Sequence, residues 1–324
     1  MLEKILITGI TGQDGLFLTK RLLDDDSDYQ IYGTTRNSNN SFLEKLKYLK
    51  PNENNRLSIV EIDLHDIKSV SELITKIKPT KLINLAGPSS VYKSYENPLK
   101  TINSINTIFD NLVNSFFKIN LEGVFFQALS SEMFDVKNNK KIDEKSVIKP
   151  RSPYAIGKSQ IYEKSLELRE KKDVNITNGF LFNHESEFRD DEYLIMKVIN
   201  SAINISNKKQ DKLKIGSLKL VRDWTYADDM TEAIKNIIEN SFQADYVIGS
   251  GKGYSIKEMI TSVFDEFSLD LDKHVTVDAS LLREGDPESV ISNPMKIYNE
   301  LGWRAKTSFK SLILKCVNFK IKKS

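Results

Sequence analysis

Short apolar segments alternate with segments of helical periodicity through the first 182 residues of this chain. The apolar segments lie at residues 4–8, 30–35, 57–63, 81–86, 123–130 and 174–182. They are rich in Ile, Val, Leu or Phe and mostly apolar on both faces, as strands of a parallel sheet covered by helices are. The alternation therefore predicts an α/β fold with a doubly wound parallel sheet.

Charge and composition exclude several classes of protein. The 324 residues carry 47 basic and 45 acidic side chains, a net charge of +2, so nothing points to a surface for nucleic acid. No apolar run has membrane-spanning length, and the start MLEKILITG lacks the pattern of a signal peptide. The single cysteine excludes an internal disulfide, and the three histidines are too dispersed for a metal site. We expect a cytoplasmic protein that binds no nucleic acid, membrane or metal.

A glycine-rich loop follows the first predicted strand. In ITGITGQDG, Gly9, Gly12 and Gly15 have the spacing GxxGxxG and lead into a helical segment. Glycine lets the backbone turn tightly and approach a pyrophosphate, while the helix N-terminus supplies free N–H groups. Because the loop lies in the first strand–helix turn of an alternating chain, it predicts a dinucleotide-binding site.

The ends of the second and third predicted strands indicate which dinucleotide binds. Arg36 follows the second strand at the position where an acidic residue would otherwise bind the ribose 2′-hydroxyl. An arginine there accommodates a 2′-phosphate, which favours NADP over NAD, although a solvated surface arginine is the alternative. Asp63 ends the third strand, where it can meet the adenine or cap the next helix.

A tyrosine and a lysine one helical turn apart form a candidate proton-transfer pair. In RSPYAIGK, Ser152 can cap a helix and Pro153 suits its first turn, which places Tyr154 and Lys158 on one face. A free tyrosine is a poor base at neutral pH because its pKa is about 10. A neighbouring ammonium group and an oxidised nicotinamide both favour the phenolate, so the pair suits hydride-transfer chemistry.

The apolar strand 123–130 ends in Ser130, and Glu132 follows two residues later. A carboxylate at the end of a buried strand is costly unless it meets solvent, a partner or a substrate. Taken singly, these residues are an ordinary strand-end hydroxyl and a capping or salt-bridged carboxylate. Together with Tyr154 and Lys158 they favour a catalytic group.

A combination of five stretches is more specific than any of these motifs alone. They are ITGITGQDG, FFQALSSEMF, RSPYAIGK, LFNHES and RDWTYADDM. Together they resemble the extended short-chain dehydrogenase/reductase superfamily and, within it, the GDP-mannose 4,6-dehydratase family, from residue 4 to about residue 303.

The resemblance implies a role for each of the following residues. Catalytic residues are Ser130, Glu132, Tyr154 and Lys158. Cofactor-binding residues are Thr8, Gly9, Gly12, Gln13, Asp14, Gly15, Arg36, Asp63, Leu64, Leu85, Ala86, Tyr154 and Lys158. Substrate-binding residues are Ser89, Asn183, Arg222 and Arg283.

The implied reaction converts a GDP-hexose to its 4-keto-6-deoxy product, a step in making surface-glycan precursors. Tyr154 takes the C4 hydroxyl proton as hydride passes to NADP, and Ser130 binds the C4 oxygen. Glu132 then removes the C5 proton as water leaves C6, and the hydride returns to C6. Lys158 holds the ribose and lowers the pKa of the tyrosine.

The same resemblance, with a looser pattern after residue 183, predicts two interwoven parts. Residues 1–182, with a contribution from about 221–250, form a dinucleotide-binding Rossmann domain. Residues 183–220 and 251–324 form a smaller C-terminal substrate lobe. The resemblance also implies a homodimer or homotetramer built through helices of the sheet domain.

Departures from the family pattern leave alternatives open. The turn after the fourth strand reads AGPSSV where AAQSHV is usual, which removes an amide and a histidine near the sugar. GDP-N-acetylglucosamine and a GDP-mannoheptose are therefore alternative substrates. An NADP-dependent 4-reductase or 4-epimerase is the alternative enzyme, although neither needs a C5 base such as Glu132. A dinucleotide-sensing protein without catalysis is a third class, which the intact tyrosine–lysine pair disfavours.

Overall fold

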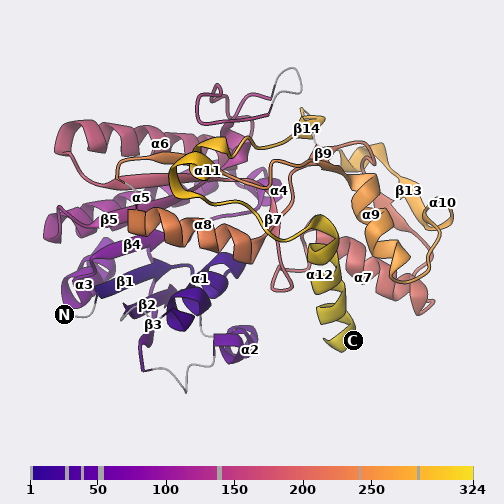
Figure 1. Ribbon diagram of the computed structural model, residues 1–324, viewed down its shortest axis with the longest axis horizontal. Coiled ribbons are helices and arrows are strands. Elements are labelled where there is room, and N and C mark those ends of the chain that lie inside the picture. The colour runs from indigo at the N-terminus through magenta and orange to yellow at the C-terminus, as the bar shows by residue number, and fades with distance from the viewer. Residues whose placement is uncertain are drawn as a thin grey trace.

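The structure, a computed structural model, describes residues 3–25, 29–37, 40–49, 55–136, 141–240, 242–282 and 285–323. Seven parallel strands form its central sheet in the order β11–β6–β5–β4–β1–β2–β3 (Figure 1). They are β1 (Glu3–Thr8), β2 (Tyr29–Thr35), β3 (Leu57–Glu61), β4 (Lys81–Asn84), β5 (Val124–Ser130), β6 (Ile176–Leu181) and β11 (Asp245–Ile248). The predicted doubly wound parallel sheet is confirmed.

Helices cover both faces of this sheet, which explains why its strands are apolar on both sides (Figure 1). One face carries α1 (Gln13–Asp24) and α8 (Ala227–Asn240); the other carries α3 (Ile67–Ile77), α5 (Pro98–Ile119) and α6 (Pro153–Lys172). Side chains of β1 divide between the faces: Leu6 packs in the core under α3, α5 and α6, whereas Ile5 and Ile7 pack in the core under α1 and α8.

The strand order reverses beside β1, because β2 and β3 extend to one side of it and β4, β5, β6 and β11 to the other. In doubly wound sheets, ligands bind in the crevice at the carboxyl ends of the strands where the order reverses. The ends of β1, β4 and β5 are therefore the expected location of a site.

The remaining elements lie together beside the sheet (Figure 1). They share a second hydrophobic core, to which Phe17 of α1 also contributes. Its helices are α7 (Leu194–Ser206), α9 (Ile256–Asp265), α10 (Leu271–His274) and α12 (Phe309–Lys323). Its strands are β8 (Leu213–Ile215) with β13 (Val275–Val277), and β9 (Val221–Arg222) with β12 (Tyr254–Ser255) and β14 (Ser289–Val290). Cys316 is fully buried in this core on α12, as its apolar surroundings in the sequence indicate.

The chain passes from the sheet to this second group of elements and back again. After β6 it forms β7 (His184–Glu185), which pairs with β10 (Thr225–Tyr226), and it then returns to the sheet through α8 and β11. The last elements of the sheet side are α11 (Met295–Leu301), which packs beside β11, and α2 (Asn40–Leu49) and α4 (Val91–Ser94), which follow β2 and β4.

Two predicted strands end earlier than the apolar pattern indicates. β3 ends at Glu61, so Asp63 lies in the following turn, where its carboxylate accepts a hydrogen bond from the backbone N–H of His65. β4 ends at Asn84, so Leu85 and Ala86 belong to the loop at the carboxyl edge of the sheet. No helix in the described ranges is long and apolar enough to cross a membrane.

Candidate active site

The glycine-rich loop closes tightly against its neighbours at two positions and is open at a third. Gly9 has a φ of +75°, and a Cβ there would lie 3.0 Å from backbone atoms of Leu85 and Ala86. A Cβ on Gly15 would lie 2.4 Å from the carbonyl oxygen of Gly9. A Cβ on Gly12, the N-cap of α1, would lie 3.4 Å from the same carbonyl oxygen and within 4 Å of no other atom of the described residues apart from its chain neighbours. Gly12 also has no side chain with which to cap the helix. The first turn of α1 therefore presents an approachable backbone, as a phosphate site requires.

The side chains of Gln13 and Asp14 connect α1 to the segment after β6. Gln13 Nε2 donates to the carbonyl oxygen of His184 at 2.9 Å, and Gln13 Oε1 accepts from Ser186 Oγ at 2.8 Å. Asp14 Oδ2 lies 2.9 Å from His184 Nε2, and His184 Nδ1 lies 2.7 Å from the carbonyl oxygen of Phe182. These two predicted cofactor-binding residues thus hold the segment 182–186 with their side chains.

Both ring nitrogens of His184 carry hydrogen, because a carboxylate and a carbonyl can only accept. Burial lowers the pKa of His184, but the charge of Asp14 and its hydrogen bond outweigh burial, so the pKa is raised above its usual value. The pair is therefore an imidazolium facing a carboxylate. The other oxygen of Asp14 is buried and has no hydrogen-bond partner.

Arg36 and Asp63 lie near each other where β2 and β3 end, and both are exposed. Hydrogen bonds from the backbone and ring of His65 lower the pKa of Asp63, and the charge of Arg36 lowers it further. Leu64 is buried in the core under α3 and α5, and its carbonyl oxygen accepts from Asn111 Nδ2. The two charged residues therefore remain accessible, whereas Leu64 presents little more than backbone.

A chain of buried hydrogen bonds links the carboxyl ends of β1, β4 and β5. Thr8 Oγ1 donates to Asn84 Oδ1 at 2.7 Å, and Asn84 Nδ2 donates to Gln127 Oε1 at 2.8 Å. The N–H of Ala86 lies 3.3 Å from Thr8 Oγ1. Sequence analysis selected Thr8 and Ala86 but neither Asn84 nor Gln127 as site residues. Their signal was available, since each is a polar amide within an otherwise apolar strand.

Tyr154 and Lys158 meet the end of β5 from α6. Ser152 caps that helix by accepting from the N–H of Ala155 at 3.1 Å, and Pro153 is its first residue, as predicted. Lys158 Nζ donates to the carbonyl oxygen of Ala128 at 2.8 Å and lies 5.8 Å from the centroid of the Tyr154 ring.

Ser130 and Glu132 complete this group. Ser130 is the last residue of β5, and its side chain hydrogen-bonds with Tyr154. Glu132 lies in the short helix η2 (Ser131–Met133), where its N–H donates to Ser130 Oγ at 3.3 Å. Its charge acts on the Tyr154 phenol, so the four residues form one cluster.

Burial moves the pKa values of the tyrosine and the lysine in opposite directions. It raises the pKa of Tyr154 to about 12, although the hydrogen bond with Ser130 lowers it in part and Glu132 raises it further. Burial lowers the pKa of Lys158 to about 8. Desolvation therefore dominates the pKa of Tyr154 in the chain alone, and the effect of Lys158 on that pKa stays a prediction.

The predicted substrate-binding residues do not form one group. Ser89 is exposed, and its Oγ lies 2.9 Å from Tyr193 Oη. Asn183 is half-buried, and its carbonyl oxygen accepts from the N–H of Thr225. Arg222 is buried and donates to Asp286 Oδ1 at 2.8 Å, so its guanidinium group connects β9 to the segment before β14. Arg283 lies outside the described residues.

Two residues near Tyr154 were not predicted as site residues. Tyr193 is the N-cap of α7, and the Arg189 guanidinium carbon lies 3.5 Å from the centroid of its ring. Both act electrostatically on the phenol of Tyr154. Arg189 lies three residues after LFNHES, one of the five stretches of the resemblance, which was the available signal. No sequence signal indicated Tyr193, because only the fold brings it to Ser89.

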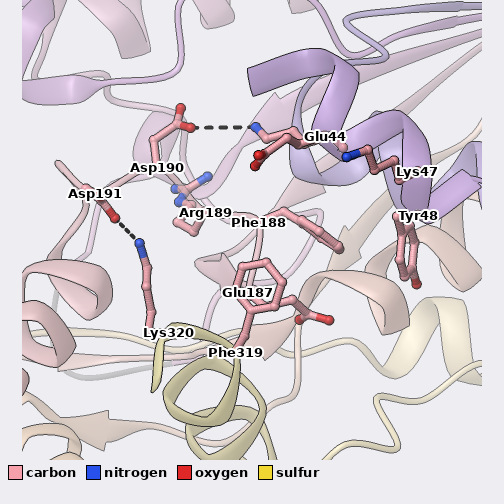
Figure 2. A pocket seen from close by; sticks show the side chains of 11 residues that line it. Glu44, Lys47, Tyr48, Glu187, Phe188, Arg189, Asp190, Asp191, Phe319 and Lys320 are labelled. Atoms are coloured by element: carbon pink, nitrogen blue, oxygen red, sulfur yellow. Dashed lines mark hydrogen bonds and ion pairs between the residues drawn. The ribbon is translucent and has the colours of Figure 1, made fainter. Parts of the chain in front are cut away.

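A pocket of about 630 Å³ lies between α2, the segment 187–191 and the end of α12 (Figure 2). Aromatic side chains line it together with charged residues of both signs, including Arg189. Lys45, on its α2 side, donates to the carbonyl oxygen of Thr11 in the glycine-rich loop at 3.3 Å. Within the part of the chain that the structure describes, no three His, Cys, Asp or Glu side chains are grouped to hold a metal ion.

Known proteins resemble this chain over most of its length. The family model of GDP-mannose 4,6 dehydratase matches residues 6–316. GDP-mannose 4,6 dehydratase 1 of Arabidopsis thaliana is 31% identical over 316 residues, which cover 95% of this chain and 87% of the plant protein. The GDP-mannose 4,6-dehydratase of Yersinia enterocolitica is 29% identical and covers 93% of this chain and 89% of its own.

Solved structures share the fold at lower sequence identity. A UDP-glucose 4-epimerase from Thermotoga maritima has a TM-score of 0.85 at 19% identity and covers 99% of both chains. A dTDP-glucose 4,6-dehydratase from Streptomyces venezuelae has a TM-score of 0.85 at 19% identity, covering 98% of this chain and 97% of its own. Both are enzymes of nucleotide sugars, and their likeness shows that this chain shares their Rossmann-like fold over the sheet and the second lobe. From the family model and the plant relative together, we conclude that this chain belongs to the GDP-mannose 4,6-dehydratase family.

Proposed function

We propose that this protein is a 4,6-dehydratase of GDP-mannose or a closely related GDP-hexose. Membership of the family supports the substrate class, and the cluster at the end of β5 supports the chemistry. The observation that carries the proposal is the position of Glu132, two residues from Ser130 and within electrostatic reach of Tyr154. A second proton acceptor beside the tyrosine is needed for loss of water, whereas a simple reductase or epimerase needs none.

Each residue of the cluster has a task that its position supports. Ser130 binds the C4 oxygen of the hexose, and Tyr154 takes the C4 hydroxyl proton. Glu132 then removes the C5 proton, which the new ketone has made acidic, as water leaves C6. NADP, held beside this cluster, would supply the acceptor for the C4 hydride and the donor that returns it to C6, while the proton on Glu132 would serve the departing hydroxyl and the proton from Tyr154 would reach C5. Because the hydride returns, turnover needs no added reductant.

The residues of the glycine-rich loop fit a dinucleotide. The open position at Gly12, beside the first turn of α1, is where a diphosphate can approach backbone N–H groups. Arg36 and Asp63, exposed at the ends of β2 and β3, suit the adenosine part. We propose NADP rather than NAD, because the Arg36 guanidinium group suits a 2′-phosphate. Lys158 would hold the nicotinamide ribose.

We propose further that residues 1–182 with about 221–250 bind the cofactor and that residues 183–220 and 251–324 bind the nucleotide sugar. Assembly into a homodimer or homotetramer is proposed through helices of the sheet domain. Large apolar side chains exposed at α4 and the start of α5 support it: Tyr92, Tyr95 and Leu99. A cytoplasmic location stays a prediction, which cell fractionation would test.

Replacement of Glu132 by glutamine tests the function most sharply. We expect Glu132→Gln to lower the rate of water loss from GDP-mannose by about 100-fold or more, because a general base contributes at least that factor. Cofactor binding should stay unchanged, since the side chain keeps its shape. Product mass and fluorescence titration with NADPH measure the two effects.

The matched control is Glu122→Gln, which changes an exposed carboxylate in the loop before β5. It should retain full activity. Water loss by Glu132→Gln at the native rate would refute the proposal. Conversion by the native protein to a product of unchanged mass, without water loss, would indicate a 4-epimerase.

A further inference from the structure

A pair of hydroxyl groups spans the two lobes beside the catalytic cluster. Ser89 lies in the loop between β4 and α4 on the sheet side, and Tyr193 begins α7 in the second lobe. Their oxygens are 2.9 Å apart. Glu192 and Lys93, the neighbours in each segment, form an ion pair that spans the same gap. Two adjacent hydroxyls, each able to donate and accept, suit recognition of a sugar hydroxyl.

Arg189 holds Tyr193 in its orientation. Its guanidinium carbon lies 3.5 Å from the centroid of the tyrosine ring, close enough for a cation–π contact. On its other side, Arg189 Nε lies 3.1 Å from the buried carboxylate of Glu185. The ring of Tyr193 is therefore fixed from one face, while its hydroxyl points to Ser89.

The ion pair between Arg189 and Glu185 leaves two buried polar atoms without a hydrogen bond. Arg189 Nε and Glu185 Oε2 are close, but neither has a hydrogen bond of good geometry, and both are buried. Buried polar atoms without such bonds are unusual and call for an explanation. A ligand that orders the segment 185–193 would supply one, by aligning the guanidinium group with its carboxylate.

The position of Arg189 and Tyr193 relative to Tyr154 limits which part of the substrate they can contact. Arg189 and Tyr193 both act on the Tyr154 phenol, which takes the C4 proton in the function proposed above. Tyr193 therefore lies within electrostatic reach of the group that takes the C4 proton in the proposed function, and its contact with Ser89 keeps its hydroxyl at the sheet side of the site. The loop that carries Ser89 is AGPSSV, which lacks an amide and a histidine usual in the family.

We propose that Tyr193 is a specificity-determining residue, whose hydroxyl, with that of Ser89, binds a ring hydroxyl of the GDP-hexose at C2 or C3. Arg189 is its positioning residue. The inference rests on the proposed function, because it names the sugar contact of the same site. A polar site that hydrogen-bonds a substrate hydroxyl discriminates against a sugar that lacks it.

The test is a cycle in which one hydroxyl is removed from the protein and one from the sugar. Native protein and Tyr193→Phe are each measured with GDP-mannose and with its 2-deoxy and 3-deoxy analogues. The phenylalanine keeps the ring on which Arg189 stacks, so the fold is retained. Both kcat/KM and the Kd for binding to the cofactor-loaded protein are determined.

We expect Tyr193→Phe to weaken binding of GDP-mannose by about 3- to 10-fold, the usual effect of losing one neutral hydrogen bond. For one of the two deoxy analogues the substitution should leave the Kd almost unchanged, because that sugar already lacks the hydroxyl that Tyr193 would bind. Arg189→Lys should reduce the same preference, since the planar stack is lost. Tyr298→Phe, which removes the hydroxyl from a tyrosine on α11 whose ring also carries an arginine, should change nothing.

An equal loss for all three sugars would overturn the inference, because it would make the hydroxyl structural rather than a sugar contact. So would an unchanged preference in Tyr193→Phe. The proposed function is tested separately by turnover of the native protein. If that protein binds GDP-mannose without removing water, the function fails, and the binding cycle still decides the role of Tyr193.

Discussion

Burial sets the protonation of the two proton-transfer residues before any ligand is considered. With pKa values of about 12 for Tyr154 and about 8 for Lys158, the phenol is neutral at pH 7 and the ammonium group loses its proton more easily than in water. The positive ring of an oxidised nicotinamide beside the phenol would favour the phenolate. The tyrosine therefore becomes a base only in the loaded site.

The buried lysine should reduce stability at neutral pH. Its folded pKa of about 8 is below the ordinary 10.5, so the unfolded chain binds the proton more tightly. The cost is full below about pH 8 and disappears as the pH rises toward about 10.5. We expect Lys158→Met to abolish activity but raise the free energy of unfolding at pH 7 by up to about 3 kcal/mol. Urea denaturation measures it; a less stable variant at pH 7 would contradict this account.

Local spacing made several single residues predictable. Ser152, Tyr154 and Lys158 follow from a helix start and an i, i+4 pair, which need no knowledge of the remaining fold. The partners of Arg222 were not predictable, because Asp286 is 64 residues away in sequence. The role of Tyr193 was not predictable for the same reason, because its contact with Ser89 joins segments that are 104 residues apart.

The first strand–helix turn is the element on which the proposed cofactor binding depends. Gly15 packs so closely that a methyl group would lie 2.4 Å from the Gly9 carbonyl oxygen, and a backbone atom cannot move away as a side chain can. Gly12 has ordinary φ and no such contact. The two glycines therefore serve different purposes, one for packing and one for access.

Two alanine substitutions separate these purposes. Gly15→Ala should lower the free energy of unfolding by about 2 kcal/mol or more, as overpacking does. Gly12→Ala should leave stability within about 0.5 kcal/mol but weaken NADPH binding at least about 10-fold, because its methyl group faces the expected diphosphate. Thermal denaturation and fluorescence titration measure the pair. Equal stability losses in both variants would disprove the distinction.

The ion pair of Asp14 and His184 joins α1 to the segment after β6. Because the pKa of His184 is raised above 6.5, its stabilising effect is complete below about pH 6.5 and is lost as the pH rises through the folded value. Arg189 also faces this histidine and lowers its pKa in part.

Asp14→Asn should therefore destabilise the protein by about 2 kcal/mol near pH 6 and by much less near pH 9. At high pH the neutral histidine no longer offsets the buried charge of Asp14 and only the Arg189 guanidinium group remains to do so, so removal of that charge costs less. Unfolding midpoints at the two pH values give the comparison. A loss of stability that is equal at both would show that the pair is not ionised at low pH.

Elements of the sheet were predictable because strands buried on both faces are apolar throughout, and six of the seven were found in this way. β11 lies within the range of about 221–250, which only the resemblance assigned to the Rossmann domain, since nothing local indicates that this segment pairs with β6. The strand ends were less certain, because Asp63, Leu85 and Ala86 continue the pattern of their strands but turn away at the edge of the sheet.

At the scale of the whole molecule, the candidate site lies where the sheet meets the second lobe. Gln13, Asp14 and Ser89 bind the segment 184–193 from the sheet side, so this segment is held against both the glycine-rich loop and the catalytic cluster. The pocket in Figure 2 borders the same segment. Sequence patterns do not predict such a meeting of lobes, because its contacts depend on how the two cores pack.

The central claim is that a hydride leaves C4 of a GDP-hexose and returns to C6 of the same molecule as water is lost. Incubation of the protein with GDP-mannose deuterated at C4, without added reductant, tests it most directly. The account predicts a product that has lost one water and carries the deuterium at C6, by mass spectrometry and NMR. A product that keeps its water, or deuterium that appears in released cofactor instead of at C6, would contradict it.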